Sequence, residues 1–223
     1  MPGRTLAIGD IHGCHVALEV LLEQLRVQPD DTVVIVGDVV DRGPGTRQSI
    51  ELLLDLQVRA KLVFIMGNHE EMMLDAIAGG ELLAGWLRFG GQEAVLSYGA
   101  DIADIPAEHV AFLRSSVDYY ESDTDIFVHA NLEPGVPLEQ QQPEWLRWTR
   151  LTGFETRHVS GKRVLCGHTP QVSGLPAAWD GWVCLDTWAY HGLFLTCLDA
   201  STNTVYQSRQ TGEFRIFALE DLK

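Results

Sequence analysis

Short apolar runs alternate with segments of helical periodicity through the first third of this 223-residue chain. The apolar runs span residues 5–9, 32–37 and 61–67, and the helical patterns that follow them span residues 15–26, 46–56 and 70–79. This alternation predicts a mostly parallel sheet with helices packed outside it. Because the runs are continuous rather than alternating in polarity, we expect both faces of these strands to be covered.

The last 60 residues have a different pattern, in which short strands are separated by turns. The strand candidates are residues 162–168, 181–187, 193–199, 204–208 and 214–218. They indicate a second sheet packed on the first. We therefore predict the α/β class, with two stacked mixed β-sheets flanked by helices, in one domain over residues 1–223. Residues 80–116 contain short helical patterns with glycine breaks, and we expect them to form a helical cap segment.

The composition excludes some classes of partner. Acidic residues outnumber basic ones by 31 to 16, which gives a formal net charge of −15. This balance disfavours sequence-independent nucleic-acid binding and attachment to anionic membranes. The start of the chain lacks the long apolar run of a signal peptide, so we expect a cytoplasmic protein. The four cysteines have no Cys-x-x-Cys spacing, which predicts reduced and mostly buried thiols.

Polar side chains that can bind metal follow five of the apolar runs. They are Asp10 and His12, Asp38, Asn68, His129 and His168, with Asp41, Arg42 and His69 beside them. Glycine stands directly before the first polar residue in four of the five cases, which permits close approach to a ligand. Because ligands bind at the carboxyl ends of strands in open α/β sheets, we expect these side chains to form one site.

The donor atoms predict two metal ions. Carboxylate, amide and imidazole donors without a thiolate suit manganese, and iron or zinc as alternatives. Six donors exceed what one ion needs, whereas two ions about 3.5–4 Å apart that share a carboxylate would use them all. We expect Asp38 to be shared, because its strand should lie centrally. The other ligands would be Asp10 and His12 for one ion, and Asn68, His129 and His168 for the second. The pair would bind and deprotonate a water, which gives a hydroxide nucleophile near neutral pH.

Several short motifs resemble the signature of the phosphoprotein phosphatase superfamily of metallophosphoesterases. They are GDIHG, GDVVDRG, GNHE, VHA and CGHTP, which occur in the superfamily's order between residues 9 and 170. The resemblance is to its small bacterial and phage serine/threonine phosphatases and to symmetrical diadenosine tetraphosphatases, and it covers nearly the whole chain. It implies an αββα sandwich and the same six metal ligands.

The resemblance also implies roles for polar residues outside the ligand set. His69 matches the superfamily's general acid, which would protonate the leaving oxygen. We expect Asp41 to hydrogen-bond His69 and to favour its protonated form. Arg42 should bind the phosphoryl oxygens, and Arg150 falls where small members of the superfamily carry another phosphate-binding arginine.

Four positions depart from the pattern of the superfamily. Met66 stands where phage-like relatives carry an arginine, so one phosphate contact would be missing. Phe89 replaces the asparagine of an Asn-Gly-Gly segment, and Asn131 replaces a small residue. Trp188 replaces a glycine, and we expect its bulk to narrow the groove beside His168.

These observations predict a phosphoester hydrolase. The main hypothesis is a serine/threonine or dual-specificity protein phosphatase that acts on phosphorylated proteins or peptides. The alternative is a hydrolase of dinucleoside polyphosphates such as diadenosine tetraphosphate. The dinucleotide branch tends to carry GNHD, whereas this chain has Glu70, which favours the protein phosphatase. A metal-binding scaffold without catalysis would need a lost ligand or a lost acid, and none is lost.

Overall fold

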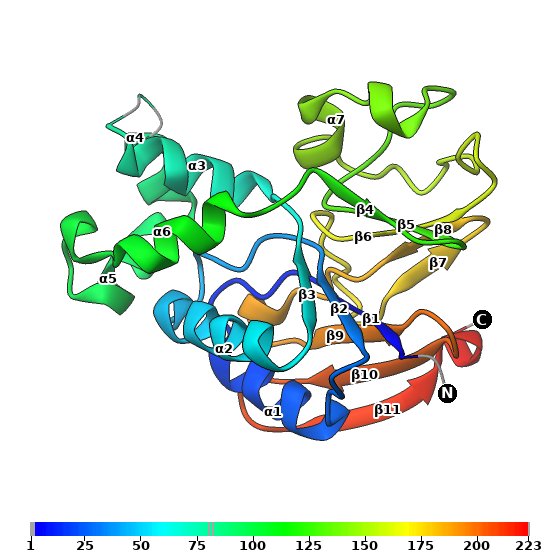
Figure 1. The fold of residues 1–223 in the computed structure, drawn as a ribbon, viewed down its shortest axis with the longest axis horizontal. Coiled ribbons are helices and arrows are strands. Elements are labelled where there is room, and N and C mark those ends of the chain that lie inside the picture. The colour runs from blue at the N-terminus through cyan, green and yellow to red at the C-terminus, as the bar shows by residue number, and fades with distance from the viewer. Residues whose placement is uncertain (1–2, 80, 82, 223) are drawn as a thin grey trace.

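The computed structural model describes residues 3–79, 81 and 83–222, and it contains two mixed β-sheets (Figure 1). The first sheet contains, in spatial order, β11 (Phe214–Ala218), β10 (Thr204–Ser208), β9 (Leu195–Asp199), β1 (Thr5–Ile8), β2 (Thr32–Ile35) and β3 (Lys61–Phe64). The second contains β4 (Tyr119–Glu121), β5 (Asp125–Val128), β6 (Arg163–Cys166), β8 (Trp182–Cys184) and β7 (Ala177–Trp179). The predicted α/β class with two mixed sheets flanked by helices is confirmed.

Three neighbouring strands of each sheet run parallel, so their carboxyl ends lie at the same edge of that sheet. In the first sheet β1 pairs with β2 and β2 with β3, both in parallel. In the second sheet β6 lies between β5 and β8, again in parallel. The outer strands, such as β9 beside β1 and β4 beside β5, are antiparallel. The polar residues that follow the parallel strands are therefore gathered by the topology itself.

The helices connect the strands. All but the last of them lie beside the first sheet, whereas the last packs against the second sheet through Leu146 (Figure 1). They are α1 (His15–Leu25), α2 (Thr46–Arg59), α3 (Asn68–Ile77), α4 (Leu83–Trp86), α5 (Gln92–Tyr98), α6 (Ala107–Arg114) and α7 (Pro143–Arg147). The prediction for α3 began two residues too late. Asn68 and His69 consequently lie in the first turn of this helix rather than in the loop before it.

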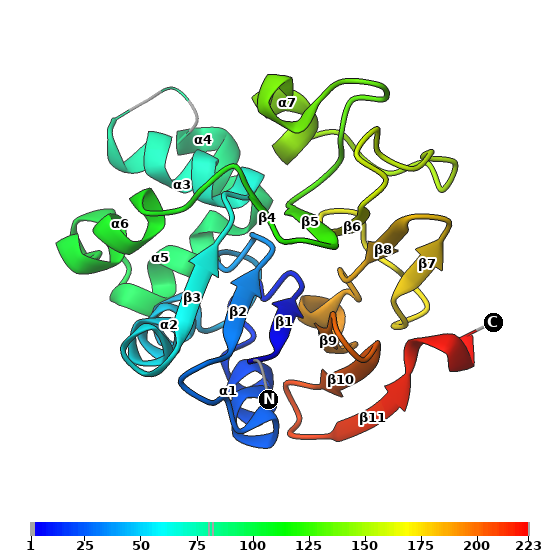
Figure 2. The ribbon, with the colours of Figure 1, turned by 45° about the vertical axis from the view of Figure 1, so that its right-hand side comes forward.

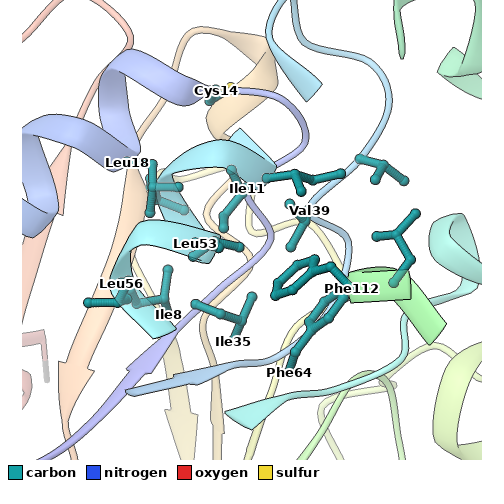
Figure 3. Packing of buried hydrophobic residues seen from close by; sticks show 14 of the residues in the cluster. Ile8, Ile11, Cys14, Leu18, Ile35, Val39, Leu53, Leu56, Phe64 and Phe112 are labelled. Carbon is teal, nitrogen blue, oxygen red and sulfur yellow. The ribbon is translucent and has the colours of Figure 1, made fainter. Parts of the chain in front are cut away.

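Alternate residues of each strand contact different layers of the molecule. In β1, Leu6 and Ile8 belong to the core beneath α1 and α2, where they meet Leu18 and Leu53 (Figure 3). Ala7, between them, belongs to the core that joins the two sheets. Burial on both faces explains why these strands are continuous apolar runs in the sequence. All four cysteines are free and buried, as predicted.

Three details of the sheets differ from the prediction. The last three strands, β9 to β11, do not join the second sheet but extend the first, next to β1 (Figure 2). In addition β2, which precedes Asp38, is the second strand from an edge rather than a central one. Polarity patterns reveal that a segment is a strand, but they do not identify its neighbour. β4 and β7, each three residues long, were not predicted at all.

Short helices fill most of the predicted cap segment. α4 continues into a π-helical turn at Leu87–Gly91, where Gly90 has a φ of 114° and separates it from α5. Residues 80 and 82 of the predicted cap, like residues 1, 2 and 223 of the predicted domain, lie outside the described residues. The organisation as one domain with a cap stays a prediction. None of the described helices has the length and apolar character needed to cross a membrane.

Candidate active site

The loops after the parallel strands turn sharply to bring their polar residues together. Five of these residues have left-handed backbone angles, with φ between 45° and 72°: His12, Asp38, Asp41, Arg42 and His168. Such angles cost non-glycine residues about 1–2 kcal/mol each. The first two turns are tied to each other, because the amides of Ile11 and His12 both donate to the Asp38 carbonyl. Strain of this kind, held in place by surrounding contacts, is typical of functional sites.

Glycines before these residues make room for the side chains of neighbouring loops. A Cβ atom on Gly37, whose φ is 102°, would lie 2.5 Å from Nδ1 of His129. A Cβ atom on Gly167 would lie 1.9 Å from Oδ1 of Asp10, although the φ of Gly167 is an ordinary one. Close approach, more than unusual backbone angles, therefore requires glycine at this edge.

Asp38 lies at the centre of the candidate metal ligands. Its Oδ2 is 3.5 Å from Nε2 of His12, and its Oδ1 is 3.4 Å from Nε2 of His129. Asn68 contributes Oδ1, which lies 3.1 Å from Nε2 of His129 and 3.0 Å from Nδ1 of His168. Asp38 belongs to two clusters whose ligand atoms lie within 4.8 Å of one another, one with His129 and His168 and one with His12 and His69.

The imidazoles of His12 and His129 are oriented as metal ligands should be. Nδ1 of His12 donates to the Val40 carbonyl at 2.9 Å, and Nδ1 of His129 donates to the Val36 carbonyl at 2.8 Å. These bonds leave Nε2 of each ring without a proton, so its lone pair is available to a cation bound beside Asp38. Burial lowers the pKa of both histidines, which keeps the rings neutral and able to bind a cation.

Asp10 is buried but belongs to neither of the two clusters. Its carboxylate accepts a hydrogen bond from the amide of His168, at 3.0 Å to Oδ2. His69, rather than Asp10, completes the cluster of His12 and Asp38. Burial, with Asp186 and Asp38 close by, raises the pKa of Asp10 well above its usual value. Buried carboxylates that repel each other are stabilised by a divalent cation, so the donor set fits metal binding.

His69, Asp41 and Trp86 form a buried hydrogen-bonded chain. Nδ1 of His69 lies 2.7 Å from Oδ2 of Asp41, and the indole of Trp86 donates to both carboxylate oxygens of Asp41 at 2.9 Å. Burial disfavours the imidazolium, but Asp38 and Asp41 outweigh it and raise the pKa of His69. Burial raises the pKa of Asp41 to about 6, which leaves it ionised at neutral pH. The contact between Asp41 and His69 that the sequence predicted is therefore present.

Glu70 clamps two of the turns together. One of its oxygens accepts from the amides of Val39 and Val40 at 2.8 and 3.2 Å. The other accepts from the amides of Asp38 and Gly67 at 2.9 and 3.0 Å. Four backbone donors on one buried carboxylate hold the turns after β2 and β3 in fixed relation. The sequence analysis used Glu70 only to compare motifs and missed this role.

Asp186 is a second residue that the sequence analysis missed. It is 1% exposed, follows β8, and contributes to the raised pKa of Asp10. Burial raises its pKa to about 7. The signal was available, because Asp186 ends an apolar strand in the same way as Asp10 and Asp38 do.

A cavity of about 230 Å³ opens onto these residues. Arg42 and Arg150 both line it, together with Asp38, Asn68 and His69. The guanidinium of Arg42 lies over the ring of Tyr190, 4.7 Å from its centroid, and 3.1 Å from Nε2 of His12. The guanidinium of Arg150 has no hydrogen-bond or ion-pair partner within the part of the chain that the structure describes. The cavity thus presents positive charge within a strongly acidic protein.

The four residues that depart from the superfamily's sequence pattern do not lie together in the structure. Phe89 lines the cavity and is 60% exposed. Met66 contacts the hydroxyl of Ser116 through its sulfur, and Trp188 stacks on His191 with ring centroids 4.3 Å apart. The side-chain amide of Asn131 donates to the carbonyl of Arg150 at 3.3 Å, and so helps to position that residue.

Comparison with known proteins adds a family and a fold. The family described as calcineurin-like phosphoesterase matches residues 3–183. A symmetrical bis(5'-nucleosyl)-tetraphosphatase from Dechloromonas aromatica is 34% identical over 133 residues, which cover 58% of this chain and 44% of that protein. Serine/threonine-protein phosphatase 1 from Salmonella typhimurium is 41% identical over 85 residues, 38% of this chain and 37% of that protein. The matched region therefore spans less than half the length of these two relatives.

A solved structure with the same fold is known. It is provisionally described as a diadenosine tetraphosphatase and superposes with a TM-score of 0.67 at 22% identity, covering 97% of this chain and 94% of that one.

Proposed function

We propose that this chain, which belongs to the calcineurin-like phosphoesterase family, is a protein phosphatase that removes phosphate from phosphoserine and phosphothreonine. Membership of the family makes it a metal-dependent hydrolase of phosphoester bonds. The observation that carries the finer proposal is the cavity, in which two arginines free of carboxylate partners lie beside the metal-binding clusters and the His69–Asp41 pair. This arrangement suits a single phosphoryl group.

Six residues are proposed as metal ligands: Asp10, His12, Asp38, Asn68, His129 and His168. Their oxygen and imidazole donors suit Mn²⁺, with iron or zinc as alternatives. When bound, a pair of divalent ions would activate water and neutralise charge on the phosphoryl oxygens. The protein's part is to fix the donors, through strained turns and through the carbonyls of Val36 and Val40.

His69 is proposed as the general acid. Its Nδ1 proton is engaged by Asp41, so the proton on Nε2 is the one available to the leaving oxygen. The indole of Trp86, which lies in the cap segment, fixes the Asp41 carboxylate and thereby the orientation of the His69 ring. A serine or threonine alkoxide is a poor leaving group, so proton transfer to it contributes a large part of the rate.

Arg42 and Arg150 are proposed to bind the phosphoryl oxygens. The two arginines lie in connections next to different sheets. Arg42 follows β2 of the first sheet, and Arg150 lies in the connection before β6 of the second. A phosphoryl group between them would be held from two directions by charge-assisted hydrogen bonds. Tyr190 supports Arg42 from beneath through the face of its ring.

The second candidate is hydrolysis of a dinucleoside polyphosphate. The observation that favours it is the 34% identity to a protein named as a symmetrical bis(5'-nucleosyl)-tetraphosphatase. The small cavity and its two arginines favour the phosphomonoester, because a tetraphosphate chain would need more cations to neutralise it.

A product assay separates the two candidates. Purified protein with Mn²⁺ is given a phosphothreonine peptide or diadenosine tetraphosphate, and metal-stripped protein is the control. We expect phosphate from the peptide and little turnover of the dinucleotide. Release of ADP from the dinucleotide, with no phosphate from the peptide, would assign the second function instead.

A further inference from the structure

A second cavity, of about 290 Å³, adjoins the candidate active site. Trp148 lines the first cavity, Thr149 lines the second, and Arg150 lines both. The phosphate-binding role proposed for Arg150 thus places this residue on the boundary between two hollows. Arg150 is therefore the residue past which a ligand in the first cavity would extend toward the second.

The boundary between the cavities is anchored to the active-site loops. Asn131 holds the Arg150 carbonyl at 3.3 Å, and the Leu151 amide donates to the hydroxyl of Thr169 at 3.0 Å. Asn131 lies two residues after His129, and Thr169 directly follows His168. The position of the second cavity is consequently fixed relative to the candidate metal ligands.

Most polar groups in the wall of the second cavity already have partners. Glu155 accepts three hydrogen bonds from Thr152 and Gly153, and Arg157 is paired with Asp180 at 2.6 Å. Both ring nitrogens of His158 are also engaged, by the Ser160 hydroxyl and the Val136 carbonyl. What the wall still offers to a ligand is mainly apolar surface, which includes three aromatic side chains: Trp145, Phe154 and Trp182.

Phe154 is the most exposed of these aromatic residues. It lies in the loop before β6, and 88% of it is exposed. A turn closed by Glu155 fixes the backbone on either side of it. Covering an exposed ring with an apolar group is favourable in water, so Phe154 at a cavity wall is suited to contact a ligand.

The charged residues that line the second cavity disfavour the binding of further phosphate groups there. Beyond Arg150, the one other arginine of the wall already has a carboxylate partner, and Glu133 and Glu155 add negative charge. Additional phosphate groups would meet no free cation there. A neutral apolar group meets no such penalty.

We propose that the second cavity binds an aromatic or large aliphatic side chain of a phosphorylated peptide, close in sequence to the phosphorylated residue. This inference rests on the proposed function and adds a sequence preference to it. The preference arises from apolar burial, so it affects the capture of the peptide rather than the chemistry at phosphorus.

The test uses an alanine-based phosphothreonine peptide in which one phenylalanine is moved through the three positions on either side of the phosphothreonine. For the full chain with Mn²⁺, we expect kcat/KM to rise by about tenfold at one or two positions relative to the all-alanine peptide. Phe154→Ala should remove most of this ratio, and Phe154→Trp should restore it. Val58→Ala is the matched control, since Val58 is 87% exposed and lies on α2.

The outcomes separate the two proposals. Hydrolysis of p-nitrophenyl phosphate establishes that each preparation is active. If that ester is hydrolysed but no phosphothreonine peptide is, the proposed function fails. If the peptides are hydrolysed at rates that do not depend on the phenylalanine, or if the preference survives Phe154→Ala, the second cavity does not bind the peptide.

Discussion

The edge of the two sheets and the connection between β5 and β6, at residues 131–161, both contribute to the candidate active site, but they are held in different ways. At the sheet edge, His12, Asp38 and His129 are at most 2% exposed, and each is fixed by backbone geometry or backbone hydrogen bonds. In the loop, Arg150 and Phe154 are exposed and are held through a few side-chain bonds.

We expect the rigid sheet edge to serve the chemical step and the connection at residues 131–161 to serve substrate recognition. Metal-binding and proton-transferring groups need positions that vary little, and buried strand ends provide them. Residues that meet the variable part of a substrate can lie in a loop, provided that the loop is anchored at a few points. Changes at the sheet edge should therefore lower turnover for all substrates, whereas changes in the loop should alter KM and selectivity.

The largest effect is expected for Asp38→Asn, because this residue belongs to both candidate clusters. Loss of its charge should reduce the bound metal strongly and lower activity to that of chelator-treated wild type. Metal analysis after dialysis and a peptide assay would measure both effects. Asp30→Asn, at an exposed position, is the control. A variant that keeps its metal and its activity would contradict the central position of Asp38.

His69→Asn should come next, with a loss of about 10²–10⁴-fold in kcat on a phosphothreonine peptide. The loss should be much smaller on p-nitrophenyl phosphate, whose leaving group needs little protonation. Metal analysis adds a second test, since His69 lies within a candidate cluster. Equal losses on both substrates together with lost metal would make His69 a ligand rather than the acid.

Trp86→Phe should lower kcat on the peptide by about tenfold, because it removes a hydrogen bond to the Asp41 carboxylate while keeping a large ring. As with His69, the loss should be smaller on p-nitrophenyl phosphate. Trp179→Phe is a matched control, since the indole N–H of Trp179 has no partner in the described structure. A loss that is equal on both substrates would indicate general damage to the cap.

Asn131→Ala tests the anchoring of the loop. It removes the side-chain hydrogen bonds to the Arg150 carbonyl and from the Leu132 amide, so we expect KM for the peptide to rise about two- to tenfold with kcat nearly unchanged. Steady-state kinetics give both quantities. A fall in kcat with constant KM would place Asn131 with the rigid sheet edge instead.

The smallest effect on activity is expected at the opposite end of the strands, where Arg4 and Asp31 form a 2.6 Å ion pair. Burial alone would raise the pKa of Asp31, but hydrogen bonds from Arg4 and from the Gln28 amide outweigh it and lower the pKa. The pair should thus stabilise the fold above about pH 4 and lose this effect as the pH falls through the lowered pKa of Asp31.

Asp31→Ala should therefore lower the free energy of unfolding by about 1–3 kcal/mol at pH 7, and by less at pH 3, without changing kcat. Urea titrations at the two pH values would measure it. An equal loss at both pH values would show that charge is not the source of the stabilisation.

The sequence was sufficient for the features that depend on local pattern. The strands that carry Asp10, Asp38 and His129 were predicted because an apolar run followed by a polar residue is visible without knowledge of the partners. The contact of Asp41 with His69 followed from resemblance. Trp86 could not be assigned, since a tryptophan in a helical segment gives no sign of the carboxylate it will meet 45 residues earlier.

Which strands pair with each other could not be predicted from the local sequence pattern either. β9 has the same polarity whether it lies in the first sheet or the second, and only the pairing of Leu6 with Asp199 decides between them. The second cavity was likewise invisible, because its lining combines α7 and β8 with a long connection that has no periodicity. Asp186 apart, the residues that sequence reasoning missed are those that act through distant neighbours.

The clamp formed by Glu70 has a consequence for the exchange of hydrogens with solvent. The amides of Asp38, Val39 and Val40 are sealed by a carboxylate that lies 30 to 32 residues further along the chain. A local fluctuation of the turn cannot release them, because the carboxylate would then be buried with too few donors. Deuterium should therefore reach these three amides only when the whole unit from β2 through α2 to β3 opens, although they lie in a loop rather than in a helix or a strand.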